Sequence, residues 1–208
     1  MTEAKEIRIL TQTIKQFTLE FIEQPYICYT EHGLHARFYT SFYNALSDEQ
    51  QYFDWEGKKV SVIQKEYPTA TNLDRSRRQH WDISLIKNPP EIAFPEEPKP
   101  YDFFKLLGVV EFGMNESVVH LKDDIDRLCH SEANVENSFL VHLYRLTNPG
   151  NQYSRRDLSN RSINIVSKEN AAKLTKENQV EIFYGMYDDT NPDECGAWHL
   201  HDGKIEEI

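Results

Sequence analysis

The amino-terminal part of the chain carries two apolar stripes with helical spacing. Apolar residues recur at alternating intervals of three and four between residues 3 and 23, which predicts an amphipathic helix. Pro25 ends this helix, because the residue before a proline disfavours the helical conformation. A second stripe predicts a helix that begins at Glu31, with Thr30 as its N-cap. The two stripes consist of Ile7, Leu10, Ile14, Phe17 and Phe21, and of Leu34, Phe38, Phe42 and Leu46.

The pattern then changes to short apolar or alternating runs, which predict strands. Five prolines in residues 88–102 exclude regular structure there and predict an exposed loop between two strands of one sheet. The full order, α, α, β, β, β, α, β, α, β, predicts a single α/β domain over residues 1–208, with a mixed sheet flanked by helices. Strands are predicted at 58–69, 80–87, 106–114, 138–146 and 179–187, and further helices at 117–130 and 168–178.

Composition limits the classes of protein to which the chain can belong. An apolar content of 39% and an aromatic content of 12% provide for a folded core. The sequence lacks a run of about 18 apolar residues and has a charged start, which predicts a cytoplasmic protein that does not span a membrane. Three widely separated cysteines favour reduced thiols. A net charge of -11 opposes a nucleic-acid-coating role, because phosphate neutralisation needs clustered lysine and arginine.

Two of the predicted strands carry an acid within an apolar run. Glu111 lies in GVVEFGM and Asp82 in HWDISLI. Desolvating a carboxylate costs several kcal/mol unless a partner compensates the charge. Each acid taken alone can point to water on the outer face of its strand, since strand side chains alternate. Taken together, they form a candidate cation site.

The series Glu31 at the start of a helix, Asp82 in WDISLI, Glu111 in GVVEFGM and the following helix HLKDDIDRL resembles the PD-(D/E)XK nuclease superfamily. The similarity covers residues 30–146, preceded by an added helix in residues 1–25 and followed by a carboxyl-terminal extension in residues 147–208. The resemblance implies a restriction-endonuclease-like αβββαβ core and Mg²⁺- or Mn²⁺-dependent hydrolysis of phosphodiesters. It also implies that Asp82 and Glu111 bind the metal, with Glu31 on or near it. Carboxylate oxygens are ligands that Mg²⁺ prefers.

The chain departs from the family motif at Gly113, where the motif has a lysine two residues after the strand glutamate. Three explanations remain open. Lys65 or Lys122 supplies the positive charge from another element; the metal acts without a lysine; or the chain is an inactive descendant that binds a protein or nucleic acid. In the catalytic alternative, Arg75, Arg77 and Arg78 hold the substrate backbone, although solvated loop charges are the ordinary role of such residues.

Two histidine groups are weaker candidates. His32 and His35 follow Glu31 at helical spacing and are interpreted as packing or solvent-facing residues, or as accessory groups near the metal. Cys195, His199 and His201 lie in CGAWHLHD, where alternate positions of a strand would share a face. A surface hairpin is the simpler interpretation of this segment, and a Zn²⁺ site is the alternative.

Overall fold

A seven-stranded mixed sheet forms the centre of the protein. The computed structural model describes residues 4–69, 79–96, 103–147 and 165–208. Within the sheet, β5 and β6 are parallel, as are β6 and β7, and the other neighbouring strands are antiparallel. The strand order is β3 (Ile63–Pro68), β4 (His80–Ile86), β5 (Leu106–Met114), β6 (Ser138–Leu146), β7 (Val180–Asp188), β8 (Gly196–His201) and β9 (Lys204–Glu207).

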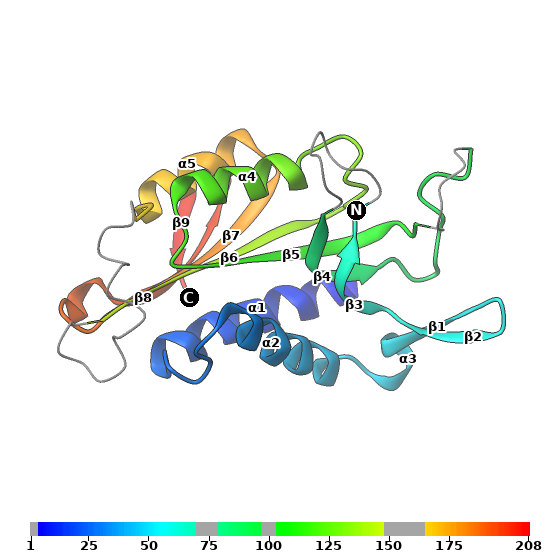
Figure 1. Ribbon diagram of the computed structural model, residues 1–208, viewed down its shortest axis with the longest axis horizontal. Coiled ribbons are helices and arrows are strands. Elements are labelled where there is room, and N and C mark those ends of the chain that lie inside the picture. Colours follow the sequence, from blue (N-terminus) through cyan, green and yellow to red (C-terminus); the bar gives the residue numbers. More distant parts are fainter. Residues whose placement is uncertain (1–3, 70–78, 97–102, 148–164) are drawn as a thin grey trace.

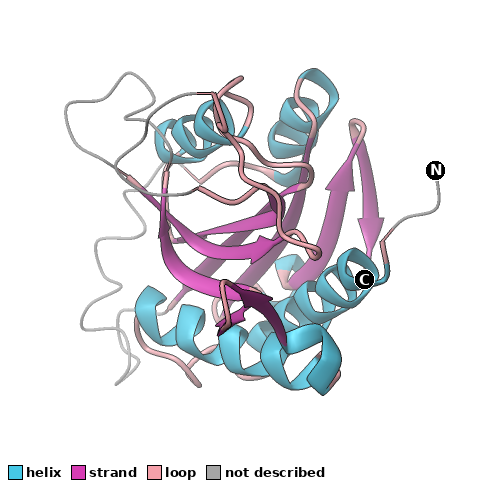
Figure 2. Ribbon diagram, turned by 90° about the vertical axis from the view of Figure 1, so that its right-hand side faces the viewer, coloured by secondary structure: helices cyan, strands magenta, loops and turns pink. Residues whose placement is uncertain are grey.

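Helices cover both faces of the sheet, so the predicted α/β architecture is confirmed (Figure 1). Helices α1 (Lys5–Glu23) and α2 (Glu31–Ala45) lie on one face, and α4 (Val118–Leu128) and α5 (Lys168–Glu177) lie on the other. The view turned by 90° shows the same layering around the twisted strands (Figure 2). The result is a three-layer arrangement in which apolar helix stripes and strand faces meet.

The two predicted amino-terminal helices are confirmed, together with the apolar stripes and the N-cap that predicted them. Every apolar member of the two predicted stripes is buried, from Ile7 to Leu46. Thr30 caps α2, since its hydroxyl accepts a hydrogen bond from the Gly33 N–H at 3.1 Å. Phe17 and Phe38 bring the two helices together edge to face over Phe112 of β5, with ring centroids 5.3 to 5.9 Å apart.

The predicted strand at 58–69 is wrong as one element, because the chain bends at Val62. Residues before the bend form β2 (Lys58–Ser61), which pairs with β1 (Tyr52–Trp55) in a separate hairpin, and residues after it form β3. A short helix, α3 (Asp48–Gln51), precedes the hairpin. Val62 is buried and its backbone bonds both Gln51 and Ile86, so the bend is held by the core and by two neighbouring segments.

The carboxyl-terminal hairpin extends the main sheet. After a turn of 3₁₀ helix, η3 (Pro192–Glu194), β8 pairs with β7 and β9 pairs with β8. Leu200 is fully buried, so the interpretation of this segment as a surface hairpin is wrong for β8. Packing of α5 against β8 and β9 explains the burial.

The proline-rich segment is described for residues 88–96 and lacks helix there, as predicted. Its one pairing is an isolated bridge between Ile92 and Phe104, and Glu91 forms ion pairs with Lys87 and Lys105. Residues 97–102 lie outside the described part of the chain. Helices long and apolar enough to cross a bilayer are absent from the described segments.

Candidate functional site

Two of the predicted acids bind backbone amides of β5 where its pairing with β4 ends. The β4–β5 ladder runs from Ile86 to Ile83, and at the next residue the Asp82 side chain accepts a hydrogen bond from the Phe112 N–H at 2.9 Å. Glu31, the first residue of α2, accepts one from the Met114 N–H at 3.0 Å. The two carboxylates therefore satisfy strand amides that β4 no longer reaches, which is a structural role for both.

Glu111, the third predicted acid, is held by an arginine. Its side chain is buried, and its Oε2 accepts from the Arg127 guanidinium of α4 at 3.0 Å. Asp124 accepts from the same guanidinium nitrogen at 2.5 Å, and the guanidinium carbon lies 5.6 Å from the centre of the Trp81 ring. Arg127 was absent from the sequence candidates. The sequence feature that could have identified Arg127 is its i,i+3 spacing from Asp124 on the predicted helix.

Burial is the largest cause of the raised pKa of each acid, and repulsion between acids is a smaller cause. The pKa of Asp82 rises to about 6 through burial, opposed by the bond from Phe112. Burial and then the charge of Asp82 raise the pKa of Glu111 well above its usual range, against the lowering effect of Arg127. Burial likewise raises the pKa of Glu31, and Asp82 adds to the shift. Negative charge is therefore crowded at this end of β5.

A further ion pair extends the cluster toward the surface. The Nδ1 of His120 lies 3.1 Å from the Asp124 carboxylate, one turn along α4. The hydrogen bond to Asp124 raises the pKa of His120 to about 9, so the imidazole is protonated at neutral pH. Asp124 is thereby shared between Arg127 and His120. We call Glu111, Asp124, Arg127 and His120 the α4 ion-pair network.

Neither candidate lysine approaches the acids. Lys65 pairs with its neighbour Glu66 at 3.0 Å, and Lys122 lines a cavity between α4 and α5. Within the described segments, no lysine nitrogen lies within 4.0 Å of a carboxylate oxygen of Glu31, Asp82 or Glu111. The three arginines that were predicted to hold the substrate backbone, Arg75, Arg77 and Arg78, lie outside the described residues.

Gly113 lies against a buried histidine. Parallel pairing places Gly113 opposite His142 of β6, and a Cβ at Gly113 would lie 3.0 Å from the His142 Nδ1. His142 is buried, and its Nε2 lies 2.9 Å from the Tyr144 hydroxyl. Burial lowers the pKa of His142 to about 4, so the ring is neutral at pH 7. The space for a lysine at position 113 is therefore filled by an uncharged imidazole.

The three predicted acids do not form a preassembled Mg²⁺ site in this arrangement. Glu111 offers one buried oxygen without a hydrogen bond, Oε1, but its other oxygen is bound to Arg127 and the side chain is closed to solvent. Mg²⁺ keeps several water ligands, for which a buried and already paired carboxylate leaves little room. In the described part of the chain, the three acids are not among the groups whose ligand atoms all lie within 4.8 Å of one another.

Two other groups of side chains in the described segments have ligand atoms that all lie within 4.8 Å of one another. The first consists of His32, His35 and Glu66, and the second of His199, His201 and Glu206. In the second group each histidine has a carboxylate partner: His199 bonds Glu181 at 2.7 Å and His201 pairs with Glu206 at 3.0 Å. Cys195, which the sequence grouped with these histidines, instead bonds the backbone of Asp188.

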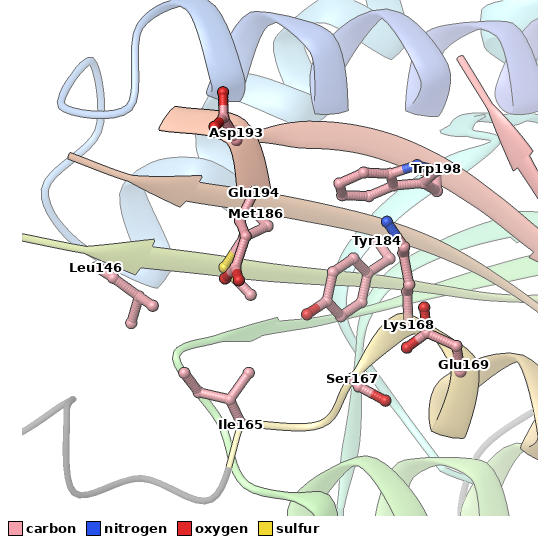
Figure 3. Close-up of a pocket in the computed structure, with 10 residues that line it drawn as sticks. All are labelled: Leu146, Ile165, Ser167, Lys168, Glu169, Tyr184, Met186, Asp193, Glu194 and Trp198. Carbon is pink, nitrogen blue, oxygen red and sulfur yellow. The ribbon is translucent and has the colours of Figure 1, made fainter. Parts of the chain in front are cut away.

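A cavity of about 330 Å³ lies away from the acids, beside the start of α5 (Figure 3). Its wall combines the Tyr184 and Trp198 rings with charged groups from α5 and η3. The Lys168 ammonium lies 3.9 Å from the centre of the Trp198 ring, so this cation already interacts with an aromatic side chain of the protein. Of the predicted site residues, those that the structure describes do not line this cavity.

Comparison with known proteins does not supply a relative. No protein-family model matches the chain, and neither a curated protein nor a solved structure shows significant similarity to it.

Proposed function

We propose that residues 30–146 form a restriction-endonuclease-like core. The support is the order of elements, in which α2 is followed, after the inserted α3 and the β1–β2 hairpin, by β3, β4 and β5, then by α4 and β6. The antiparallel β3–β4–β5 meander and the parallel β5–β6 pair agree with the αβββαβ arrangement that the sequence resemblance implies. The acids at the end of β5 agree with the motif positions of that superfamily.

On this core, we infer that the protein acts by binding and not by cleavage, as an inactive nuclease-like interaction or regulatory protein. The observation that carries the inference is the Arg127–Glu111 ion pair, which supplies a fixed positive charge to the acid expected to bind a metal. A permanent cation compensates Glu111 without an exchangeable ion. The net charge of -11 favours a basic protein partner over nucleic acid.

A cleavage assay tests this proposal. The protein is incubated with plasmid, single-stranded DNA and RNA in the presence of Mg²⁺ or Mn²⁺, beside an Asp82→Asn/Glu111→Gln variant prepared identically. We expect equal background in both preparations, because neither acid acts on a phosphodiester. Cleavage by the native chain that disappears in the variant would overturn the proposal.

Metal-dependent phosphodiester cleavage by a PD-(D/E)XK-type endonuclease or exonuclease is the second candidate. It is favoured by the raised pKa values of Glu31, Asp82 and Glu111, since perturbed carboxylates cluster at functional sites. Replacement of Lys65 or Lys122 by alanine separates the candidates. A relocated catalytic lysine predicts a loss of roughly 10²-fold or more in rate, whereas a binding protein has no rate to lose.

A further inference from the structure

His32, His35 and Glu66 meet where α2 contacts β3, beside the α4 ion-pair network but separate from it. The two histidines occupy the first turns of α2, with ring centroids 5.6 Å apart, and Glu66 lies in β3. One potential ligand atom from each residue lies within 4.8 Å of the other two. The group therefore joins a helix to the edge strand of the sheet.

The His35 ring is the unexplained member of this group. The residue is 1% exposed, and neither of its ring nitrogens has a hydrogen-bond partner among the residues that the structure describes. The Asp82 Oδ2 is 3.7 Å from His35 Nε2, which is too long for a hydrogen bond. A buried polar nitrogen without a partner costs about 1 to 3 kcal/mol. His199 and His201 of β8 do not carry this cost, because each has a carboxylate partner.

Glu66 adds a second unusual feature. Its backbone φ is 55°, in the left-handed region that a non-glycine residue seldom adopts within a strand. Such conformations concentrate at functional sites, where the surrounding structure holds them. The side chain is about half exposed, and Lys65 binds its Oε1 at 3.0 Å. Its second carboxylate oxygen has no hydrogen-bond or ion-pair partner among the described residues.

We propose that His32, His35 and Glu66 bind one transition-metal ion of the Zn²⁺ class, which links the start of α2 to β3. Two imidazoles and a carboxylate suit Zn²⁺ and its neighbours in the first transition row, in contrast to the all-oxygen sites of Mg²⁺. This centre goes beyond the proposed binding function, because it requires neither Glu111 nor a phosphodiester substrate.

The geometry needs only a small adjustment. Ligand bonds of roughly 2.0 to 2.1 Å in a tetrahedral site place ligand atoms about 3.4 Å apart. The atoms of this group are within 4.8 Å of one another, and the two ligands that must turn toward the buried ring of His35, namely His32 and Glu66, are exposed. A water molecule completes the fourth position.

Titration of the metal-free, reduced full chain with Co²⁺ and with Zn²⁺ tests the proposal. We expect one Co²⁺ per chain, with the strong visible absorption of a tetrahedral ion, and displacement of Co²⁺ by Zn²⁺. His32→Ala and Glu66→Gln change exposed side chains and should each weaken binding by at least tenfold. His201→Ala, in the β8 histidine group, is the matched control and should leave binding unchanged. Circular dichroism and the melting temperature establish that each variant is folded.

The outcomes are distinct. Absence of binding by the native chain overturns the site, as does affinity that survives both His32→Ala and Glu66→Gln. Loss of binding in His201→Ala alone assigns the metal to the β8 group instead, and a thiolate charge-transfer band assigns it to cysteine. Cleavage of nucleic acid by the metal-loaded chain would overturn the proposed binding function and leave the metal site standing.

Discussion

The Arg127 guanidinium of α4 and the Glu111 carboxylate of β5 are joined across 3.0 Å, between a helix and an inner strand of the sheet. Asp124 shares the same guanidinium and also pairs with His120, so two cations compensate two acids that are almost fully closed to solvent. Buried charges persist only when they are paired and hydrogen-bonded. The pair explains how the sheet tolerates Glu111 in an apolar strand.

Arg127→Ala should destabilise the fold by about 3 to 5 kcal/mol, because it leaves Glu111 buried without a cation and removes one of the two cations that pair with Asp124. Urea unfolding of the variant and the native chain measures the loss. Lys122→Ala, an exposed cation on the same helix, is the control and should change the free energy of unfolding by less than about 0.5 kcal/mol. A similar, small effect of both substitutions would mean that the ion pair does not support the fold.

The raised pKa of Asp82 predicts a specific pH dependence. The folded state takes up the proton more readily than the unfolded state, so the contribution of Asp82 to stability falls as pH rises from about 3.8 to about 6. Asp82→Asn keeps an oxygen for the Phe112 N–H and removes the charge. The variant should therefore gain about 2 kcal/mol relative to the native chain between pH 4 and pH 7.

The quantity to measure is the difference in the free energy of unfolding between Asp82→Asn and the native chain. His35 and His142 have pKa values lowered to about 4, so their contributions rise with pH in the same range and mask Asp82 in the native chain alone. Subtracting the native unfolding free energy from that of the variant at each pH removes the contribution of His142. The remaining difference combines the titration of Asp82 with its effect on the neighbouring His35, Glu31 and Glu111. A difference that stays constant with pH would contradict the shift assigned to Asp82.

Gly113→Ala should cost about 1 to 3 kcal/mol, because the new Cβ would meet the His142 ring at 3.0 Å. Restoring the motif with Gly113→Lys should cost at least as much, so that variant tests catalysis poorly. A double-mutant cycle with His142→Ala checks the cause. We expect the combined cost to be smaller than the sum of the two single costs, whereas strict additivity would place the strain elsewhere.

Arg145→Met should lower the free energy of unfolding by about 3 kcal/mol. The buried Arg145 guanidinium donates to the carbonyls of Pro25, Cys28 and Tyr29, which form the turn between α1 and α2. Hydrogen exchange of the turn amides should accelerate together with the loss of stability. Arg37→Met removes a more exposed cation that pairs with Glu20, and should cost less than about 1 kcal/mol.

Local pattern alone determined most of the elements. The stripe from Ile7 to Phe21 and the Thr30 cap predict α1 and α2, and the apolar run from Leu106 to Met114 predicts β5 with its observed bounds. These features depend on the period of neighbouring side chains and on capping, which act over a few residues. The split at Val62 was missed because that bend is held by hydrogen bonds to Gln51 and Ile86.

The candidate site was decided by tertiary structure. Sequence indicated that Asp82 and Glu111 need compensation, but not that Arg127 supplies it to Glu111, because the partner depends on how α4 lies on β5. The contact of Gly113 with His142 likewise follows from the register of the parallel strands. His35 and Glu66 are distant in sequence and meet only because α2 packs on β3. The residue type shows that a buried charged or polar side chain requires a partner. Which residue becomes that partner depends on how the helices pack on the sheet.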